Sequence, residues 1–221
     1  IEKVPVLVVI GITYNNQKVF LVIQQGDKES ASTWREIFKD LKQRGLKKDK
    51  IQLGVMDGLS GLEKVFSDEF SNAKIQRCQV HVSRNVLSKV PHSKKQEVAD
   101  KLRDIFYASS RPKAMEFYNQ FVLDYEKLFP SAVNSLKSNI ESCLSFFSFP
   151  KDEWISLRTT NAIERVNKEF KRRTKPMEIL AGEESTYRLL SFVALKMELT
   201  WRSAPLGRNN LPALDKFTQK N

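Results

Sequence analysis

The sequence predicts an α/β fold that carries a long all-helical segment. Stretches rich in Val and Ile alternate with amphipathic helical patterns over residues 4–81, and such alternation is typical of an α/β sheet. From residue 82 to residue 150, hydrophobic residues instead recur with the 3.6-residue period of helices. We therefore divide the chain of 221 residues into the first part of a core (1–81), a helical insertion (82–150), the C-terminal helices of the core (151–202) and an irregular tail (203–221).

The chain opens with a predicted β-hairpin over residues 4–24. The stretches "VPVLVVIGIT" and "KVFLVIQQG" read as strands, because they are rich in Val and Ile. The "YNNQ" between them reads as a turn, since adjacent Asn residues tolerate left-handed backbone conformations.

Helices and strands alternate after the hairpin. Trp34, Ile37, Phe38 and Leu41 follow the spacing of an amphipathic helix, and Gly45 is a typical helix terminator. A short apolar strand, "IQLGVMDG", comes next and runs into Asp57. It is followed by a helix, "SGLEKVFSDEF", and by a strand or strand end, "AKIQRCQVH".

Residues 82–150 predict three or four helices, with Pro112 and Pro130 marking helix starts or breaks. Two apolar faces are expected to pack in a core: Val98, Leu102, Ile105 and Phe106 on one, and Phe117, Phe121, Tyr125 and Phe129 on the other. The stretch "WISLRTT" reads as a connection. Two helices follow it, over residues 161–173 and in "ESTYRLLSFVALKMELTW".

The composition favours a polyanionic partner, because the formal net charge is +11. Nucleic acid and an anionic membrane surface are the two candidates. The longest apolar run, residues 4–12, is far shorter than the roughly 20 residues that span a membrane, and we find no signal peptide or lipid anchor. Two cysteines give no disulfide framework and fit a reducing compartment, so we expect a cytoplasmic protein.

Asp57 has two readings. It follows a buried strand, and functional groups gather at the carboxyl ends of strands in open α/β sheets. The Asp57-Gly58 pair is also a common turn. Position alone leaves both readings open.

Cys78 and His81 form a C-x-x-H pattern at or just past a strand end. A structural zinc site needs four ligands, and the remaining Cys and His residues, Cys143 and His92, lie in the helical region. A buried Cys beside a hydrogen-bonded His is therefore the simpler expectation.

The stretch "RTTNAIERVNKEFKRRTK", residues 158–175, holds seven Lys or Arg and two Glu. Glu164 can complete a capping arrangement with Asn161 as N-cap, and a helix N-terminus favours negative charge. The basic residues can form a solvated face. The same arrangement also fits a site in which Glu164 binds a metal ion and the neighbouring Lys and Arg residues bind phosphates. The candidate DNA-binding residues are Arg158, Arg165, Lys168, Lys171, Arg172, Arg173 and Lys175.

Taken together, these residues resemble the Mutator-type transposases of bacterial insertion sequences. The resemblance rests on "VMDGLSGLEKVF" and "AKIQRCQVHVSRNVL" between residues 55 and 87, and on "RTTNAIERVNKEFKRRTK" some seventy residues later. It extends over nearly the whole chain, and the combination of D-G, C-x-x-H-x-x-R-N and T-T-N-x-x-E in this order is specific.

The resemblance implies a ribonuclease H-like mixed sheet with an all-helical insertion and a DDE site of three acidic residues. Asp57 matches the second Asp, Glu164 matches the Glu, and Cys78, His81 and Asn161 match family motifs. Such a site binds two Mg²⁺ or Mn²⁺ ions, which act on phosphodiesters during DNA cleavage and joining. The implied partners are the transposon ends and target DNA, together with further copies of the chain, in a bacterial, nucleoid-associated setting.

The sequence departs from this family at its start. No residue matches the first Asp of the site, and neither the first, central strand nor the amino-terminal DNA-binding region has a counterpart. Because residue 1 is Ile and a strand begins almost at once, we expect residue 1 not to be the natural start. Because the first Asp is absent, we expect this chain alone to be inactive. Without the central strand, residues 4–12 and 50–56 would need upstream residues, each other or a second chain to cover their edges.

Two other classes of function remain open. A truncated, non-enzymatic DNA-binding or regulatory remnant would keep the basic surface and lose the chemistry. The sequence immediately upstream separates this remnant from the enzyme. A basic RNA-binding α/β module is less favoured, because the aromatic motifs that stack RNA bases are lacking.

Overall fold

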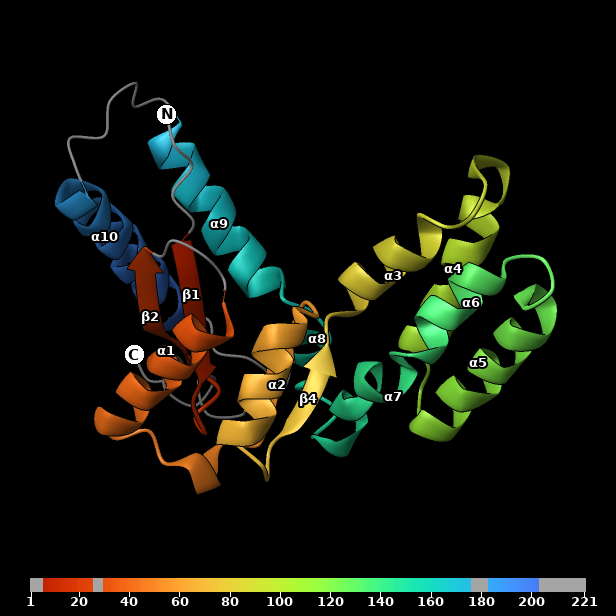
Figure 1. Cartoon of the computed structure of the whole chain (residues 1–221), viewed down its shortest axis with the longest axis horizontal. Coiled ribbons are helices and arrows are strands. Elements are labelled where there is room, and N and C mark those ends of the chain that lie inside the picture. The colour runs from red at the N-terminus through yellow and green to blue at the C-terminus, as the bar shows by residue number, and fades with distance from the viewer. Residues whose placement is uncertain (1–5, 26–29, 176–182, 203–221) are drawn as a thin grey trace, which may run out of the picture. The chain divides into compact units, whose positions relative to one another are not determined.

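The computed structural model describes residues 6–25, 30–175 and 183–202 (Figure 1). The chain forms two compact units. The hairpin unit comprises residues 1–47 and 161–221, and the helical unit comprises residues 48–160. Each unit combines helices with a two-stranded sheet, so the prediction of a mixed α/β protein is confirmed.

The hairpin unit is built on the antiparallel strands β1 (Val6–Ile12) and β2 (Lys18–Gln25). Asn16 takes the left-handed conformation predicted for this turn, with φ of 56°. The register shifts between Val9 and Ile10, which is a bulge in the ladder. Adjacent residues Leu7 and Val8 are both buried, and because neighbouring strand residues face opposite ways, both faces of the hairpin are covered.

Among its described residues, the hairpin unit also contains the helices α1 (Ala31–Gln43), α9 (Asn161–Thr174) and α10 (Glu183–Arg202). Ser30 caps α1 by accepting a hydrogen bond from the Thr33 N–H. Helices α9 and α10 lie beside the hairpin (Figure 1) and share with it a core formed by Val8, Val166, Phe170, Leu190, Val193 and Ala194. At the edge of this core the rings of Phe20 and Trp201 stack with centroids 4.9 Å apart.

The sheet of the helical unit consists of the parallel strands β3 (Leu53–Met56) and β4 (Lys74–Arg77), which are joined through α2 (Ser60–Glu69). A buried amide fixes β4 to the helical part of the unit. The Gln76 side chain donates to the carbonyl of Cys143 at 2.9 Å and accepts from the Phe146 N–H at 2.8 Å. The short β4 strand is thereby anchored although it has only one strand partner in the described residues.

The rest of the helical unit surrounds one hydrophobic core. Its helices are α3 (Gln79–Leu87), α4 (Lys95–Phe106), α5 (Arg111–Tyr125), α6 (Pro130–Lys137), α7 (Ile140–Cys143) and α8 (Trp154–Leu157), with single turns η1 (Lys48–Lys50), η2 (His92–Lys94) and η3 (Ser145–Ser148). Pro112 and Pro130 lie in the first turns of α5 and α6, as predicted.

Several boundaries differ from the sequence prediction. Helix α3 starts at Gln79, in the Val-containing stretch that resembles a strand, so the helical region begins before residue 82 and contains more pieces than the three or four expected. The predicted connection "WISLRTT" contains the short helix α8. Residues 203–221, expected to be irregular, lie outside the described residues.

The sheets also bear on the expected missing strand. In the described residues β1 pairs with β2 and β3 pairs with β4. One of the expected arrangements required residues 4–12 to pair with residues 50–56, and no such ladder is present among the described residues. Residues 1–81 contribute to both units, and their assignment to one ribonuclease H-like core stays a prediction.

Candidate functional site

Asp57 is exposed and directly follows β3. Gly58 has φ of 106°, a conformation that residues other than Gly rarely adopt. A Cβ added at Gly58 would lie 1.2 Å from Nη1 of Arg77. The backbone at Gly58 therefore passes directly against the Arg77 guanidinium, and Asp57 lies beside it at the carboxyl end of the strand.

A second carboxylate lies close to Asp57. Glu63, in the first turn of α2, forms an ion pair with Arg77, whose Nε lies 2.7 Å from Oε1 of Glu63. Burial raises the pKa of Glu63, the guanidinium of Arg77 opposes that shift, and the charge of Asp57 adds to it. This pair was not predicted from the sequence. The available signal was that Arg77 ends a strand parallel to the one that precedes Asp57.

The C-x-x-H motif lies at the start of α3, just past the end of β4, as predicted. Cys78 is fully buried, and its backbone N–H donates to the carbonyl of Met56 at 2.8 Å. Its Sγ accepts hydrogen bonds from the backbone N–H and the hydroxyl of Thr160, each at 3.3 Å. Next to it, the Gln79 N–H donates to the Arg158 carbonyl at 3.0 Å. Residues 158–160 are therefore held against the end of the β3–β4 sheet.

His81 is half-buried in the first turn of α3. Across the parts of the chain that the structure describes, no three or more His, Cys, Asp or Glu side chains gather as a group that could hold a metal ion. Cys143 is fully buried, and burial raises the pKa of its thiol to about 12. Both cysteines are free thiols.

Glu164 lies in the first turn of α9 and is half-buried. The helix begins at Asn161, one residue earlier than the predicted capping arrangement requires. Asp57 belongs to the helical unit and Glu164 to the hairpin unit. The convergence of their carboxylates therefore stays a prediction.

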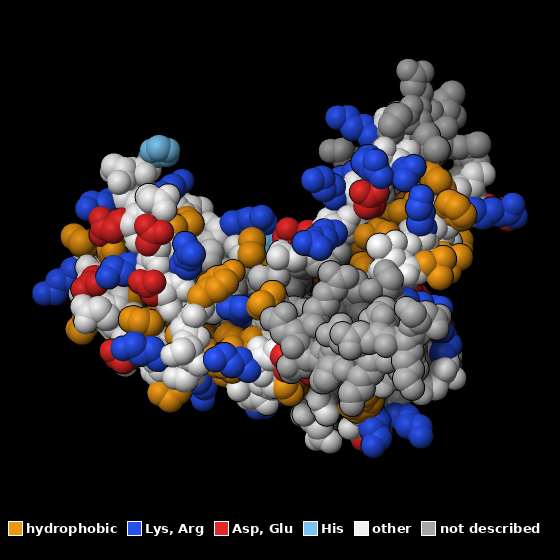
Figure 2. Space-filling model, turned by 180° about the vertical axis from the view of Figure 1, so that it is seen from behind, with side chains coloured by type: hydrophobic (Ala, Val, Ile, Leu, Met, Phe, Trp, Pro, Cys, Tyr) orange, Lys and Arg blue, Asp and Glu red, His pale blue; other side chains and the backbone are white. Residues whose placement is uncertain are grey.

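Most of the basic residues are exposed along α9. These are Arg165, Lys168, Lys171, Arg172 and Arg173, with Lys175 just beyond the helix. The opposite side of α9 buries Val166 and Phe170. Figure 2 shows Lys and Arg side chains gathered over this part of the hairpin unit. The helix therefore has the basic outer face that its sequence predicted.

Arg158 differs from these residues, because its guanidinium is half-buried within the helical unit. It lies 4.3 Å from the ring centroid of Tyr107 and donates to the carbonyls of Trp154 and Phe106. Burial lowers its pKa. The Phe106 carbonyl ends α4, so Arg158 joins the end of that helix to the segment that carries Thr160.

Lys18 is a further cation of the hairpin unit, and it was not among the predicted DNA-binding residues. It begins β2, and its Nζ lies 5.9 Å from the centroid of the Trp201 ring. Burial, together with the nearby charge of Arg165, lowers the pKa of Lys18. The positive surface of the hairpin unit thus includes a strand residue as well as α9.

No helix among the described residues is long and apolar enough to cross a membrane. The apolar helix α10 instead packs one side against the hairpin.

Comparison with known proteins identifies the family. Residues 1–204 match the family model "Transposase, Mutator family". The chain is 31% identical over 190 residues to the transposase for insertion sequence element IS905 of Lactococcus lactis, covering 86% of this chain and 48% of that protein. It is 32% identical to the transposase for IST2 of Acidithiobacillus ferrooxidans, over 78% of this chain and 58% of that protein.

A third relative is the transposase for IS6120 of Mycolicibacterium smegmatis, which is 31% identical over 91% of this chain and 62% of that protein. The chain therefore spans about half to three-fifths of the length of these relatives. The family match covers Asp57, the C-x-x-H motif and the basic helix α9 together. This chain belongs to the Mutator family of transposases.

Proposed function

We propose that the chain is the catalytic-core part of a DDE transposase with a ribonuclease H-like fold, which cuts and joins DNA phosphodiesters during transposition. Its relatives are transposases of insertion sequences. Because the chain spans only part of their length, the activity is proposed for the whole protein, in which Asp57 and Glu164 would be two of the three acidic residues.

The hydrogen bonds of Cys78 are the observation that carries this proposal. They connect the Met56 carbonyl, next to Asp57, with Thr160. Glu164 follows Thr160 by four residues, and four residues span at most about 14 Å of extended chain. The segment that directly precedes Glu164 in the chain is thus held at the strand end that bears Asp57, and this supports the proposal that both residues serve one site.

The side chains around Asp57 favour a hard cation. The Asp57 carboxylate is exposed, Glu63 is held by Arg77, and the Cys78 thiol accepts two hydrogen bonds from Thr160. Carboxylate oxygens without an available thiolate fit Mg²⁺ or Mn²⁺ better than structural zinc. Asp57 and Glu164 would hold these ions. When bound, two such ions stabilise charge on the attacking and leaving oxygens of a phosphodiester.

The exposed basic face of α9 would bind the DNA backbone through Arg165, Lys168, Lys171, Arg172, Arg173 and Lys175. Arg158 would contribute less directly, because its guanidinium is already engaged by Tyr107 and by backbone carbonyls. The proposed partners are transposon ends and target DNA, bound by a homo-oligomer.

Plasmid nicking and strand joining in Mg²⁺ by the whole protein, of which this chain is a part, test this function. Mutating residues that merely orient a metal ligand lowers affinity or activity roughly 10–100-fold, so we expect Asp57→Asn and Glu164→Gln each to lower cleavage by more than about 100-fold. Duplex DNA binding should change by less than about twofold, since the phosphate-binding residues remain. Asp68→Asn, at an exposed residue of α2, is the matched control. Full cleavage by Asp57→Asn would contradict the proposal.

A further inference from the structure

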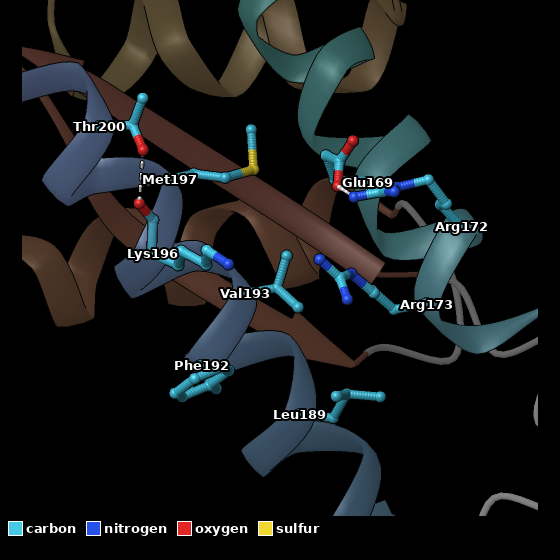
Figure 3. A pocket seen from close by; sticks show the side chains of 9 residues that line it. All are labelled: Glu169, Arg172, Arg173, Leu189, Phe192, Val193, Lys196, Met197 and Thr200. Carbon is cyan, nitrogen blue, oxygen red and sulfur yellow. Dashed lines mark hydrogen bonds and ion pairs between the residues drawn. The ribbon is translucent and has the colours of Figure 1, made fainter.

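A pocket of about 310 Å³ lies between α9 and α10, within the hairpin unit (Figure 3). We call it the α9–α10 pocket. Its size is at the lower end of the range for small-molecule sites. The floor is apolar and is formed by Leu189, Val193 and Met197 of α10. The rim is charged, so the pocket offers apolar contact below and electrostatic contact above.

The charges on the rim are not balanced within the described residues. Glu169 is paired with Arg172 of its own helix, with Oε2 2.9 Å from Nη2 and 3.2 Å from Nε. Arg173 of α9 and Lys196 of α10 also line the pocket, and neither forms an ion pair within the described residues. In Figure 3 their charged ends lie on the two sides of Val193 and point toward one another. An anion between them would relieve the repulsion of the two cations.

An exposed apolar stripe continues the pocket along α10. Phe192 lines the pocket and is 67% exposed. Leu195 and Leu199 are 55% and 56% exposed, and their spacing places them with Phe192 on one side of the helix. In Figure 2 hydrophobic side chains lie among Lys and Arg side chains on the hairpin unit. A contiguous apolar patch with a charged rim is typical of an interaction site.

We infer that the α9–α10 pocket binds an unpaired nucleotide of a DNA strand, with its phosphate between Arg173 and Lys196 and its base against Phe192. Proteins that bind single-stranded DNA combine a positive groove with aromatic side chains on which bases stack. In a duplex the faces of the bases are covered by their neighbours, so this contact requires a strand end or an opened segment. The inference rests on the proposed function and adds that the protein binds DNA with at least one unpaired nucleotide.

Charge favours DNA over an acidic peptide as the occupant. The exposed cations Arg165 and Lys168 continue along α9 from the pocket toward the start of the helix, and the net charge of the chain is +11. A phosphodiester strand carries one negative charge per nucleotide and can follow such a row, whereas an isolated carboxylate would use only the pocket.

Fluorescence anisotropy with two labelled probes tests the inference. The probes are an oligothymidylate of about 20 nucleotides, which exceeds the roughly 4–16 nucleotides of a typical single-strand site, and a blunt duplex of the same length. Phe192→Ala should weaken single-strand binding about tenfold through lost stacking and duplex binding less than about twofold. Lys196→Gln should also lower the salt slope for the single strand by about 0.7, the loss of one phosphate contact. Leu123→Ala, at a 77% exposed residue of α5 in the helical unit, is the control.

The outcomes separate this inference from the proposed function. If the unmodified protein binds neither probe, both fail. If it binds the duplex in a salt-dependent way but Phe192→Ala weakens both probes equally, or neither, only the nucleotide pocket is wrong. A peptide with acidic and apolar residues gives a further outcome. If this peptide binds the parent protein without displacing the single strand, and if Phe192→Ala abolishes its binding, the pocket is a peptide site and only the nucleotide pocket is wrong. Because Phe192 is mostly exposed, the variant should retain the melting temperature of the parent, and this is checked in parallel.

Discussion

Thr160 donates two hydrogen bonds to the Sγ of Cys78, one from its backbone N–H and one from its hydroxyl, each at 3.3 Å. The two residues are 82 positions apart and belong to two different motifs of the family, C-x-x-H and T-T-N-x-x-E. The contact joins the two motifs in the folded chain. It holds the segment before α9 against the end of β4, and through the Cys78 N–H it reaches the last residue of β3.

The sulfur is therefore expected to act as a hydrogen-bond acceptor in folding. Cys78→Ser keeps an acceptor for the Thr160 donors, whereas Cys78→Ala leaves both donors buried without one. An unsatisfied buried group costs about 1–3 kcal/mol, so Cys78→Ala should be less stable than Cys78→Ser by about 1 kcal/mol or more. Urea unfolding measures the difference. Equal stability of the two variants would show that Thr160 does not depend on the sulfur.

Gly58 provides a second test, with a matched control at Gly45. Both glycines have positive φ, 106° and 103°, so Ala at either position is strained by about 1–2 kcal/mol. A Cβ at Gly45 meets open space, whereas a Cβ at Gly58 meets the Arg77 guanidinium. Gly58→Ala should therefore lower the free energy of unfolding more than Gly45→Ala. It should also lower any Asp57-dependent cleavage, because Arg77 must move. Equal losses in the two variants would mean that Arg77 adapts freely.

Local structure could be predicted from the sequence where short-range patterns determine it. The four residues expected to face inward from the first helix, Trp34, Ile37, Phe38 and Leu41, are all buried. The Asn turn and the two Pro helix starts were found for the same reason, since each depends on the backbone preference of one or two residues. Helix α3 was misread at its start, because Val80 and Val82 favour strands locally, whereas in the fold α3 begins directly after Cys78.

The surroundings of the candidate site could not be predicted in the same way. Asp57 was found because it follows a strand. Its neighbours Glu63 and Arg77 come from the next helix and strand, and their contact depends on how those elements pack. Arg158 was grouped with the DNA-binding cations from charge alone. Its half-burial against Tyr107 depends on residues some fifty positions away, which no local pattern reveals.

Lys18 predicts a defined dependence of stability on pH. Burial and the charge of Arg165 lower its pKa below the ordinary value of 10.5, so the folded protein binds this proton less tightly than the unfolded chain. The resulting destabilisation is complete below the folded pKa and disappears as the pH rises to about 10.5. Lys18→Met should therefore stabilise the protein most near neutral pH, and this gain should shrink toward pH 10.5.

Urea unfolding from about pH 7 upward measures this gain relative to the parent protein. Lys39→Met, at an exposed lysine of α1, controls for the loss of one positive charge. If the gain in the free energy of unfolding stays constant over the whole pH range, the pKa of Lys18 is not lowered by folding.

The basic face of α9 should appear in the salt dependence of duplex DNA binding. Each phosphate contact contributes about 0.9 to the slope of log K against log salt. Changing Arg172 and Arg173 together to Ala removes two cations, but Arg172 already pairs with Glu169, which lowers its share. The slope should therefore fall by between about 0.9 and 1.8, with weaker binding at every salt concentration. The matched control removes two exposed lysines of the helical unit, Lys127 and Lys137. If both double variants flatten the slope equally, the whole basic surface attracts DNA without preference, and α9 is only a solvated face.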